Sequence, residues 1–133
     1  LSLIRIAAIE DRIGQQLRNF LQDDITPRGK PTNPSYELIV KINKTRRDLV
    51  LLQDATSTFA KISLHASYTL TNFTSGGTLA SGNVTAKTGF TITQSEYANI
   101  SAETKATSRA SREISYDIAR QLALFLKQTT SNN

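Results

Sequence analysis

The chain has 133 residues, enough for one domain whose core needs no disulfide. Cys is absent, which excludes thiol catalysis, thiolate metal sites and disulfides. The formal net charge of +5 suits anionic partners such as phosphates, although a charge of this size is also common in small domains. No apolar run reaches the length of a membrane-spanning helix. Met is also absent, so we expect Leu1 to be a trimmed or processed start.

The N-terminal part predicts a short strand followed by an amphipathic helix. Residues 1–7 are mostly apolar around Arg5, as in a short buried strand. From residue 8 to about 24, apolar side chains recur on one helical face: Ile9, Ile13, Leu17, Phe20 and Leu21. Gly14 interrupts this helix and predicts a close approach of its backbone to a sheet.

A loop and a second strand are predicted next. Residues 26–35 contain all three prolines and predict a surface loop within one domain. Residues 36–42 alternate between apolar and polar, which predicts a strand, and the charged residues 44–48 predict its turn. The apolar residues 49–52 are interpreted as the beginning of the following strand. That strand would then be too long to pair fully, so we expect a bend at residues 54–57.

Residues 58–92 predict a long hairpin, because apolar side chains recur at every second position on both arms. They are Ile62, Leu64, Ala66, Tyr68 and Leu70 before the turn at residues 72–77, and Val84, Ala86, Thr88, Phe90 and Ile92 after it. Side chains of a strand alternate between the two faces of a sheet, so one face of the hairpin is apolar and needs cover. The opposite face is polar.

A long helix is predicted from about 95 to 127. Ser95 is its expected N-cap, and its buried stripe is Ala98, Ala102, Ala106, Ala110, Ile114, Ile118, Leu122 and Phe125. Alanines in the first half would let the helix lie close against the sheet. Residues 129–133 are expected to form a disordered polar tail, which leaves residues 1–128 as a single domain.

The order β-α-β-β-β-α predicts an α+β fold. A β-α-β crossover followed by an antiparallel meander would place two helices on one face of a mixed four-stranded sheet, as a two-layer α/β sandwich.

The residues offer little for catalysis. There is a single His, no nucleophile motif, no glycine-rich phosphate loop and no cluster of carboxylates, so we assign no catalytic residue, no cofactor and no metal. A hydrolase that uses His65 with one of the serines is the weakest reading, because no acidic partner for His65 can be named.

Basic residues on the polar side of the predicted sheet are the candidate binding site. Lys61 and Lys87 share the strand phase opposite the apolar face, and His65 lies in the same row. Arg46 and Arg47 occupy the predicted turn that leads into this strand. Arg and Lys suit phosphate groups or acidic side chains, while a solvated face is the plain alternative. We expect no nucleic acid, because Tyr68 and Phe90 fall in the covered apolar phase and leave no stacking platform.

Several segments resemble the LptE family of lipopolysaccharide-assembly lipoproteins. They are IEDRIGQQLRN at residues 9–19 with the proline-rich loop and YEL after it, YTL at 68–70, the glycine-containing hairpin, SEYA at 95–98, and the helix with Ala102, Glu103 and Ala106. The resemblance covers nearly the whole chain.

The resemblance implies a lipid-anchored protein on the periplasmic face of the outer membrane, without enzymatic activity. Its implied partners are a β-barrel of LptD type, in whose lumen it would sit, and lipopolysaccharide. The family is anchored through a lipidated N-terminal Cys that this sequence lacks, which we interpret as trimming before Leu1. The alternative in the same compartment is the auxiliary lipoprotein of a lipid-transport ABC system, which has a similar mixed-sheet domain.

Overall fold

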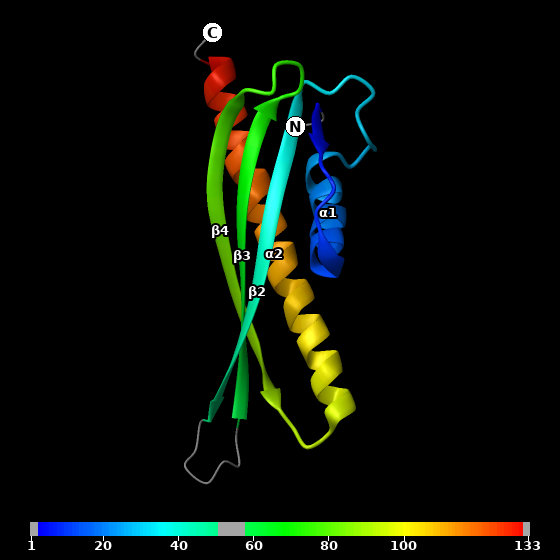
Figure 1. Cartoon of the computed structure of the whole chain (residues 1–133), viewed down its shortest axis with the longest axis vertical. Coiled ribbons are helices and arrows are strands. Elements are labelled where there is room, and N and C mark those ends of the chain that lie inside the picture. The colour runs from blue at the N-terminus through cyan, green and yellow to red at the C-terminus, as the bar shows by residue number, and fades with distance from the viewer. Residues whose placement is uncertain (1–2, 51–57, 132–133) are drawn as a thin grey trace.

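The structure confirms the predicted α+β fold and the order of its elements. A computed structural model describes residues 3–50 and 58–131 (Figure 1). Its elements are strand β1 (Ile4–Ile6), helix α1 (Asp11–Ile25), strands β2 (Tyr36–Val50), β3 (Thr58–Asn72) and β4 (Thr78–Ile92), and helix α2 (Glu96–Ser131). Within the described residues, neither helix is both long and apolar enough to cross a membrane.

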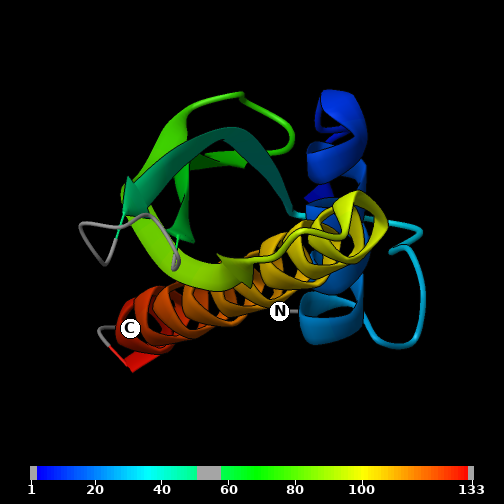
Figure 2. The same cartoon turned by 90° about the horizontal axis from the view of Figure 1, so that it is seen from below.

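The four strands form one mixed sheet in the order β1-β2-β3-β4. The short β1 is parallel to the start of β2, whereas β2, β3 and β4 form an antiparallel meander. α2 runs along the long strands, and α1 lies beside the end of β2 at which β1 pairs with its first three residues (Figure 1). Viewed from the end, the long strands curve strongly (Figure 2).

The core confirms the predicted phase of the hairpin. All five apolar positions of β3 from Ile62 to Leu70 are buried, as are Val84, Ala86 and Phe90 of β4. They pack with the buried faces of both helices in a single cluster. Lys61 and His65, in the other phase, are exposed. Both helices therefore cover the same face of the sheet.

The predicted end of β2 was wrong. Residues 44–48 lie within the strand rather than in a turn, and Leu49 and Val50 belong to β2 rather than to the next strand. The whole of β2 pairs with β3, from Tyr36 opposite Asn72 to Val50 opposite Thr58. Beyond the part covered by β1 and α1, β2 is an edge strand, where charged residues can replace the apolar alternation without loss of the ladder. The expected bend at residues 54–57 lies outside the described residues.

α1 begins at Asp11, three residues later than predicted. Gly14 does mark a close approach, but to the segment before the helix and not to the sheet. A Cβ at Gly14 would lie 2.6 Å from the Ile9 side chain and 2.9 Å from the Ile9 backbone. The short turn from β1 into the helix therefore requires a glycine at this position.

α2 begins as predicted, since the Ser95 hydroxyl accepts a hydrogen bond from the Ala98 amide at 3.2 Å. The helix extends to Ser131, beyond the expected end near residue 127. It thus overlaps the expected tail, residues 129–133, of which 132–133 lie outside the described part of the chain. The disorder predicted for the tail stays a prediction.

The alanine stripe packs α2 closely against β4. Ala106 and Ala110 are fully buried, and the Thr88 hydroxyl donates a hydrogen bond to the Ala106 carbonyl at 2.9 Å. A side chain of β4 can reach the helix backbone only because the alanines are small. Further along, the buried Ile114, Ile118 and Leu122 fill a wider space. Ala98 is exposed, so the stripe begins one turn later than predicted.

Candidate ligand-binding face of the sheet

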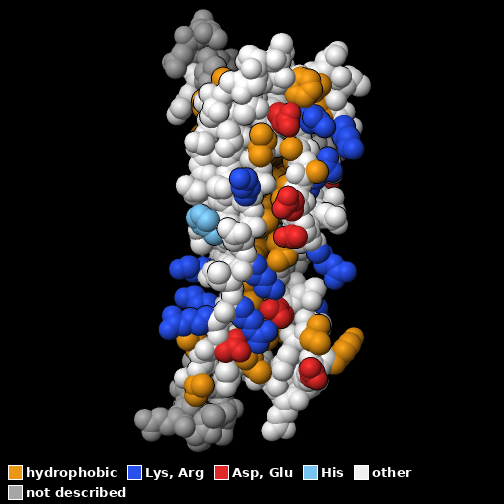
Figure 3. All heavy atoms as spheres, viewed as in Figure 1, with side chains coloured by type: hydrophobic (Ala, Val, Ile, Leu, Met, Phe, Trp, Pro, Cys, Tyr) orange, Lys and Arg blue, Asp and Glu red, His pale blue; other side chains and the backbone are white. Residues whose placement is uncertain are grey.

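The side of the sheet opposite the helices carries a group of cations, which we call the outer face. It consists of Lys41 and Arg47 on β2, Lys61 and His65 on β3, and Lys87 on β4. Strand alternation fixes this arrangement, because each of these residues lies in the phase opposite the buried positions. All five side chains are exposed. In Figure 3, Lys and Arg side chains gather below the histidine on one side of the molecule.

The strand register brings Lys61 and Lys87 close to Arg47. Arg47 is directly opposite Lys61, and Lys87 is opposite Ser63, two residues further along β3. Side chains directly opposite each other on neighbouring strands have Cβ atoms about 4.5–5.5 Å apart. Like charges at this separation destabilise a sheet. The Arg47–Lys61 pair therefore lowers the stability of the sheet. An anion bound between the two side chains would reduce their repulsion.

Acidic groups do not balance these cations. Among the described outward-facing positions of β2, β3 and β4, the register gives four Lys or Arg residues (41, 47, 61 and 87) and one acid, Glu37, which leaves a charge of +3. Glu37 lies at the far end of β2, where its carboxylate pairs with Arg5 at 3.6 Å. None of the four cations forms an ion pair with another described residue.

Arg46 does not belong to this face, contrary to the prediction. It points to the helix side, where its guanidinium pairs with Asp48 at 2.9 Å and with Glu103 of α2 at 3.1 Å. It also lies over the Phe90 ring, 5.3 Å from the centroid. The hydrogen bond to Asp48, followed by the charge of Glu103, raises the pKa of Arg46. Arg46 therefore joins β2 to α2, and its part in ligand binding stays a prediction.

His65 lies in the middle of the outer face. Its Nδ1 shares a hydrogen bond of 2.8 Å with the Thr85 hydroxyl of β4. Ser63 and Ser67 are two residues away along the strand, about 7 Å from His65. In the described part of the chain, no carboxylate pairs with His65, and no three His, Asp or Glu residues lie close enough together to hold a metal.

Lys41 was not among the predicted candidates, although it is in the polar phase of β2. It is opposite Ser67, one row of the sheet beyond the row of His65. Only the register between β2 and β3 shows that it continues the same group of cations. Exposed hydroxyl and amide side chains, Asn43, Thr45 and Thr85, lie between the cations. The resulting surface is open and suits the binding of an extended anionic molecule.

Comparison with known proteins shows the family to which the chain belongs. A family model described as LptE, lipopolysaccharide-assembly, matches residues 2–123 of the chain. The chain belongs to this family. A search of curated protein sequences found no significant match. As a member of the LptE family, the protein is a lipopolysaccharide-assembly lipoprotein of the outer membrane.

Solved structures share the LptE fold. A candidate lipoprotein from Caulobacter crescentus CB15 has 24% sequence identity and a TM-score of 0.77, over 95% of this chain and 92% of that one. Rare lipoprotein B from Shewanella oneidensis has 8% identity and a TM-score of 0.69, over 98% of both chains. A minor lipoprotein from Acinetobacter baumannii has 14% identity and a TM-score of 0.67, over 91% of this chain and 90% of that one. At these identities the likeness concerns the fold alone.

Proposed function

We propose that the protein acts without catalysis at the periplasmic face of the outer membrane, where it binds lipopolysaccharide and a β-barrel partner of LptD type. Membership of the lipopolysaccharide-assembly family supports this proposal for the process. The outer face supports it for the binding site, since its unpaired cations suit the phosphates of lipid A or acidic groups of a barrel wall.

The observation that carries the binding proposal is the like-charged pair Arg47 and Lys61, with Lys87 close by and no acid among the described residues that pairs with them. A charged strand edge can serve solubility, for which single lysines suffice. Opposed cations on neighbouring strands instead reduce stability. An anionic partner would offset this loss of stability, which exposure to solvent alone does not do.

Charge reversal tests the proposal. The double variant Lys61→Glu with Lys87→Glu should weaken the binding of purified lipopolysaccharide by at least about tenfold, since two charged contacts become repulsive. The loss should shrink as salt rises, because exposed charges are screened. Binding would be measured by surface plasmon resonance on immobilised lipopolysaccharide, and barrel association by co-purification from the native membrane.

The matched control is Arg28→Glu with Lys105→Glu, which makes the same change in net charge at exposed positions away from the outer face. It should bind lipopolysaccharide within about twofold of the unmodified protein and keep the original melting temperature. Lys61→Glu with Lys87→Glu should not melt at a lower temperature, because position 61 then carries a charge opposite to that of Arg47. Equal losses in the two double variants would show that net charge, and not the outer face, governs binding.

A further inference from the structure

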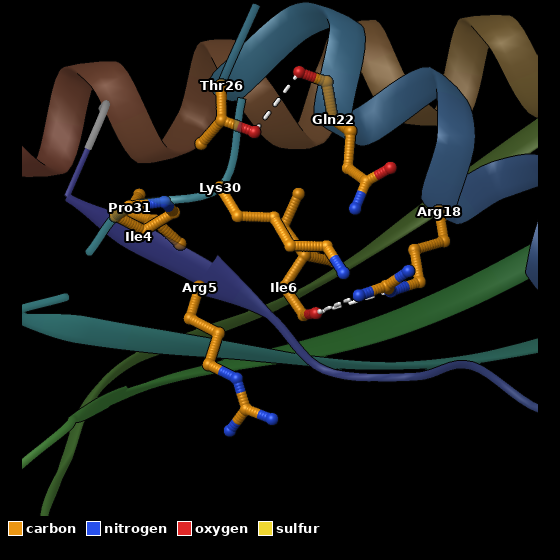
Figure 4. A pocket seen from close by; sticks show the side chains of 8 residues that line it. All are labelled: Ile4, Arg5, Ile6, Arg18, Gln22, Thr26, Lys30 and Pro31. Carbon is orange, nitrogen blue, oxygen red and sulfur yellow. Dashed lines mark hydrogen bonds between the residues drawn. The ribbon is translucent and has the colours of Figure 1, made fainter. Parts of the chain in front are cut away.

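A small cavity of about 140 Å³ lies between β1, α1 and the loop that follows α1. Ile4 and Ile6 supply its apolar wall, and Arg18, Gln22, Thr26 and Lys30 supply its polar groups (Figure 4). None of these residues belongs to the outer face. The volume corresponds to about five water molecules at ~30 Å³ each, which suits a group the size of a phosphate.

Three donors, two from α1 and one from the loop that follows it, point into this space. The ends of Lys30, Gln22 and Arg18 point toward the same region beside the Ile6 carbonyl (Figure 4). Arg18 is held in place, because its Nε and Nη2 donate to the Ile6 carbonyl at 3.3 and 3.2 Å. The Nη1 edge of its guanidinium makes no hydrogen bond to the described residues. The cavity therefore contains a fixed cation with unused donors.

None of the described residues that line this cavity is an acid. Arg5, a further lining residue, points away from the cavity in Figure 4 and pairs with Glu37. Within the described residues, the ammonium of Lys30 and the side-chain amide of Gln22 have no polar partner. Two cations, Arg18 and Lys30, thus share one cavity without a counter-ion, and such a pair is stabilised by an anion between them.

We propose that this cavity binds a phosphate group, either free or as the monoester of a larger molecule. The planar guanidinium of Arg18 can donate along one edge of a tetrahedral oxyanion, the Lys30 ammonium can contact another oxygen as a point charge, and the Gln22 amide can donate to a third. The inference is independent of the proposed function, because the two sites share no residue.

Titration of the ¹⁵N-labelled chain with inorganic phosphate, at constant ionic strength set with chloride, tests the site. Saturable NMR shifts are expected at the Gln22 side-chain amide and the Arg18 Nε–H. Lys30→Gln should weaken binding about tenfold, the loss expected for one charged hydrogen bond. The control Arg28→Gln removes an exposed cation of the same loop that does not line the cavity. It should change the affinity by less than twofold.

A second titration with dihexanoylphosphatidic acid, a short-chain lipid with a phosphate monoester, separates the possible sources of the group. Tighter binding of the lipid at the same resonances would assign the cavity to a lipid headgroup, and similar affinities would assign it to the phosphate alone. Two results would overturn the proposal. One is the absence of saturable shifts with either probe, and the other is an equal loss in Lys30→Gln and Arg28→Gln.

Discussion

At the scale of single residues, Arg46 and Arg47 show how strand alternation separates the roles of neighbours. Arg46 faces α2, where Asp48 and Glu103 raise its pKa and fix its guanidinium. Arg47 faces the opposite side, across from Lys61, and has no described acidic partner. Arg46 therefore stabilises the fold, whereas Arg47 lowers its stability and belongs to the proposed binding surface.

This division predicts the effect of Arg47→Glu. The variant replaces a like-charged cross-strand pair by an oppositely charged one, so the free energy of unfolding should rise by about 0.2–1 kcal/mol. Urea unfolding followed by circular dichroism, at low salt and in 1 M NaCl, would measure the change. Because the pair is exposed, the gain should largely vanish at high salt. A loss of stability, or a gain unaffected by salt, would mean that Arg47 has another role.

At the scale of elements, strands could be predicted from the sequence where apolar and polar residues alternate regularly. The hairpin of β3 and β4 was predicted together with its buried phase, because its apolar residues face a helix over almost its whole length. The continuation of β2 was not predicted. In that part of β2 the helix-facing positions are Lys44, Arg46 and Asp48. Charged residues at positions where a strand would carry apolar ones predict a turn. The ion pairs of Lys44 and Arg46 with Glu103, which make these charges compatible with a strand, are tertiary contacts.

Alternation also decided which residues of the candidate site could be predicted. Lys61, His65 and Lys87 share a phase within one hairpin, so the sequence alone placed them on one face. Lys41 and Arg47 join them only through the register of β2 with β3, which local sequence does not specify. The cavity for which we propose phosphate binding could not be predicted for a similar reason. Its walls come from β1, α1 and the proline-rich loop, and only the folded chain brings these segments together.

The contact between α2 and β4 gives the prediction for this scale. Ala106→Leu should lower the free energy of unfolding by about 1–3 kcal/mol, because the added side chain has no room beside the Thr88 hydrogen bond. Chemical denaturation would measure it. Ala98→Leu, at an exposed position of the same helix, is the control and should be nearly neutral. Similar stabilities for both variants would contradict close packing of α2 against β4.

At the scale of the whole molecule, the two faces of the sheet carry different kinds of residue. The helix side holds the apolar core and the ion pairs of Arg46, whereas the outer face presents cations without described acidic partners. A protein of the LptE family built in this way can bind a large anionic partner without unfolding any element. That residues 1–128 form one domain stays a prediction.

Photo-crosslinking in living bacteria tests most directly whether the outer face is the binding side. p-Benzoylphenylalanine would be placed at Thr45, an exposed position between the outer-face cations of β2, and separately at Tyr116, an exposed position on α2. We predict crosslinks to lipopolysaccharide or to a β-barrel of LptD type from position 45 and none above background from position 116. Crosslinks to these partners from position 116 alone would contradict the assignment of the outer face.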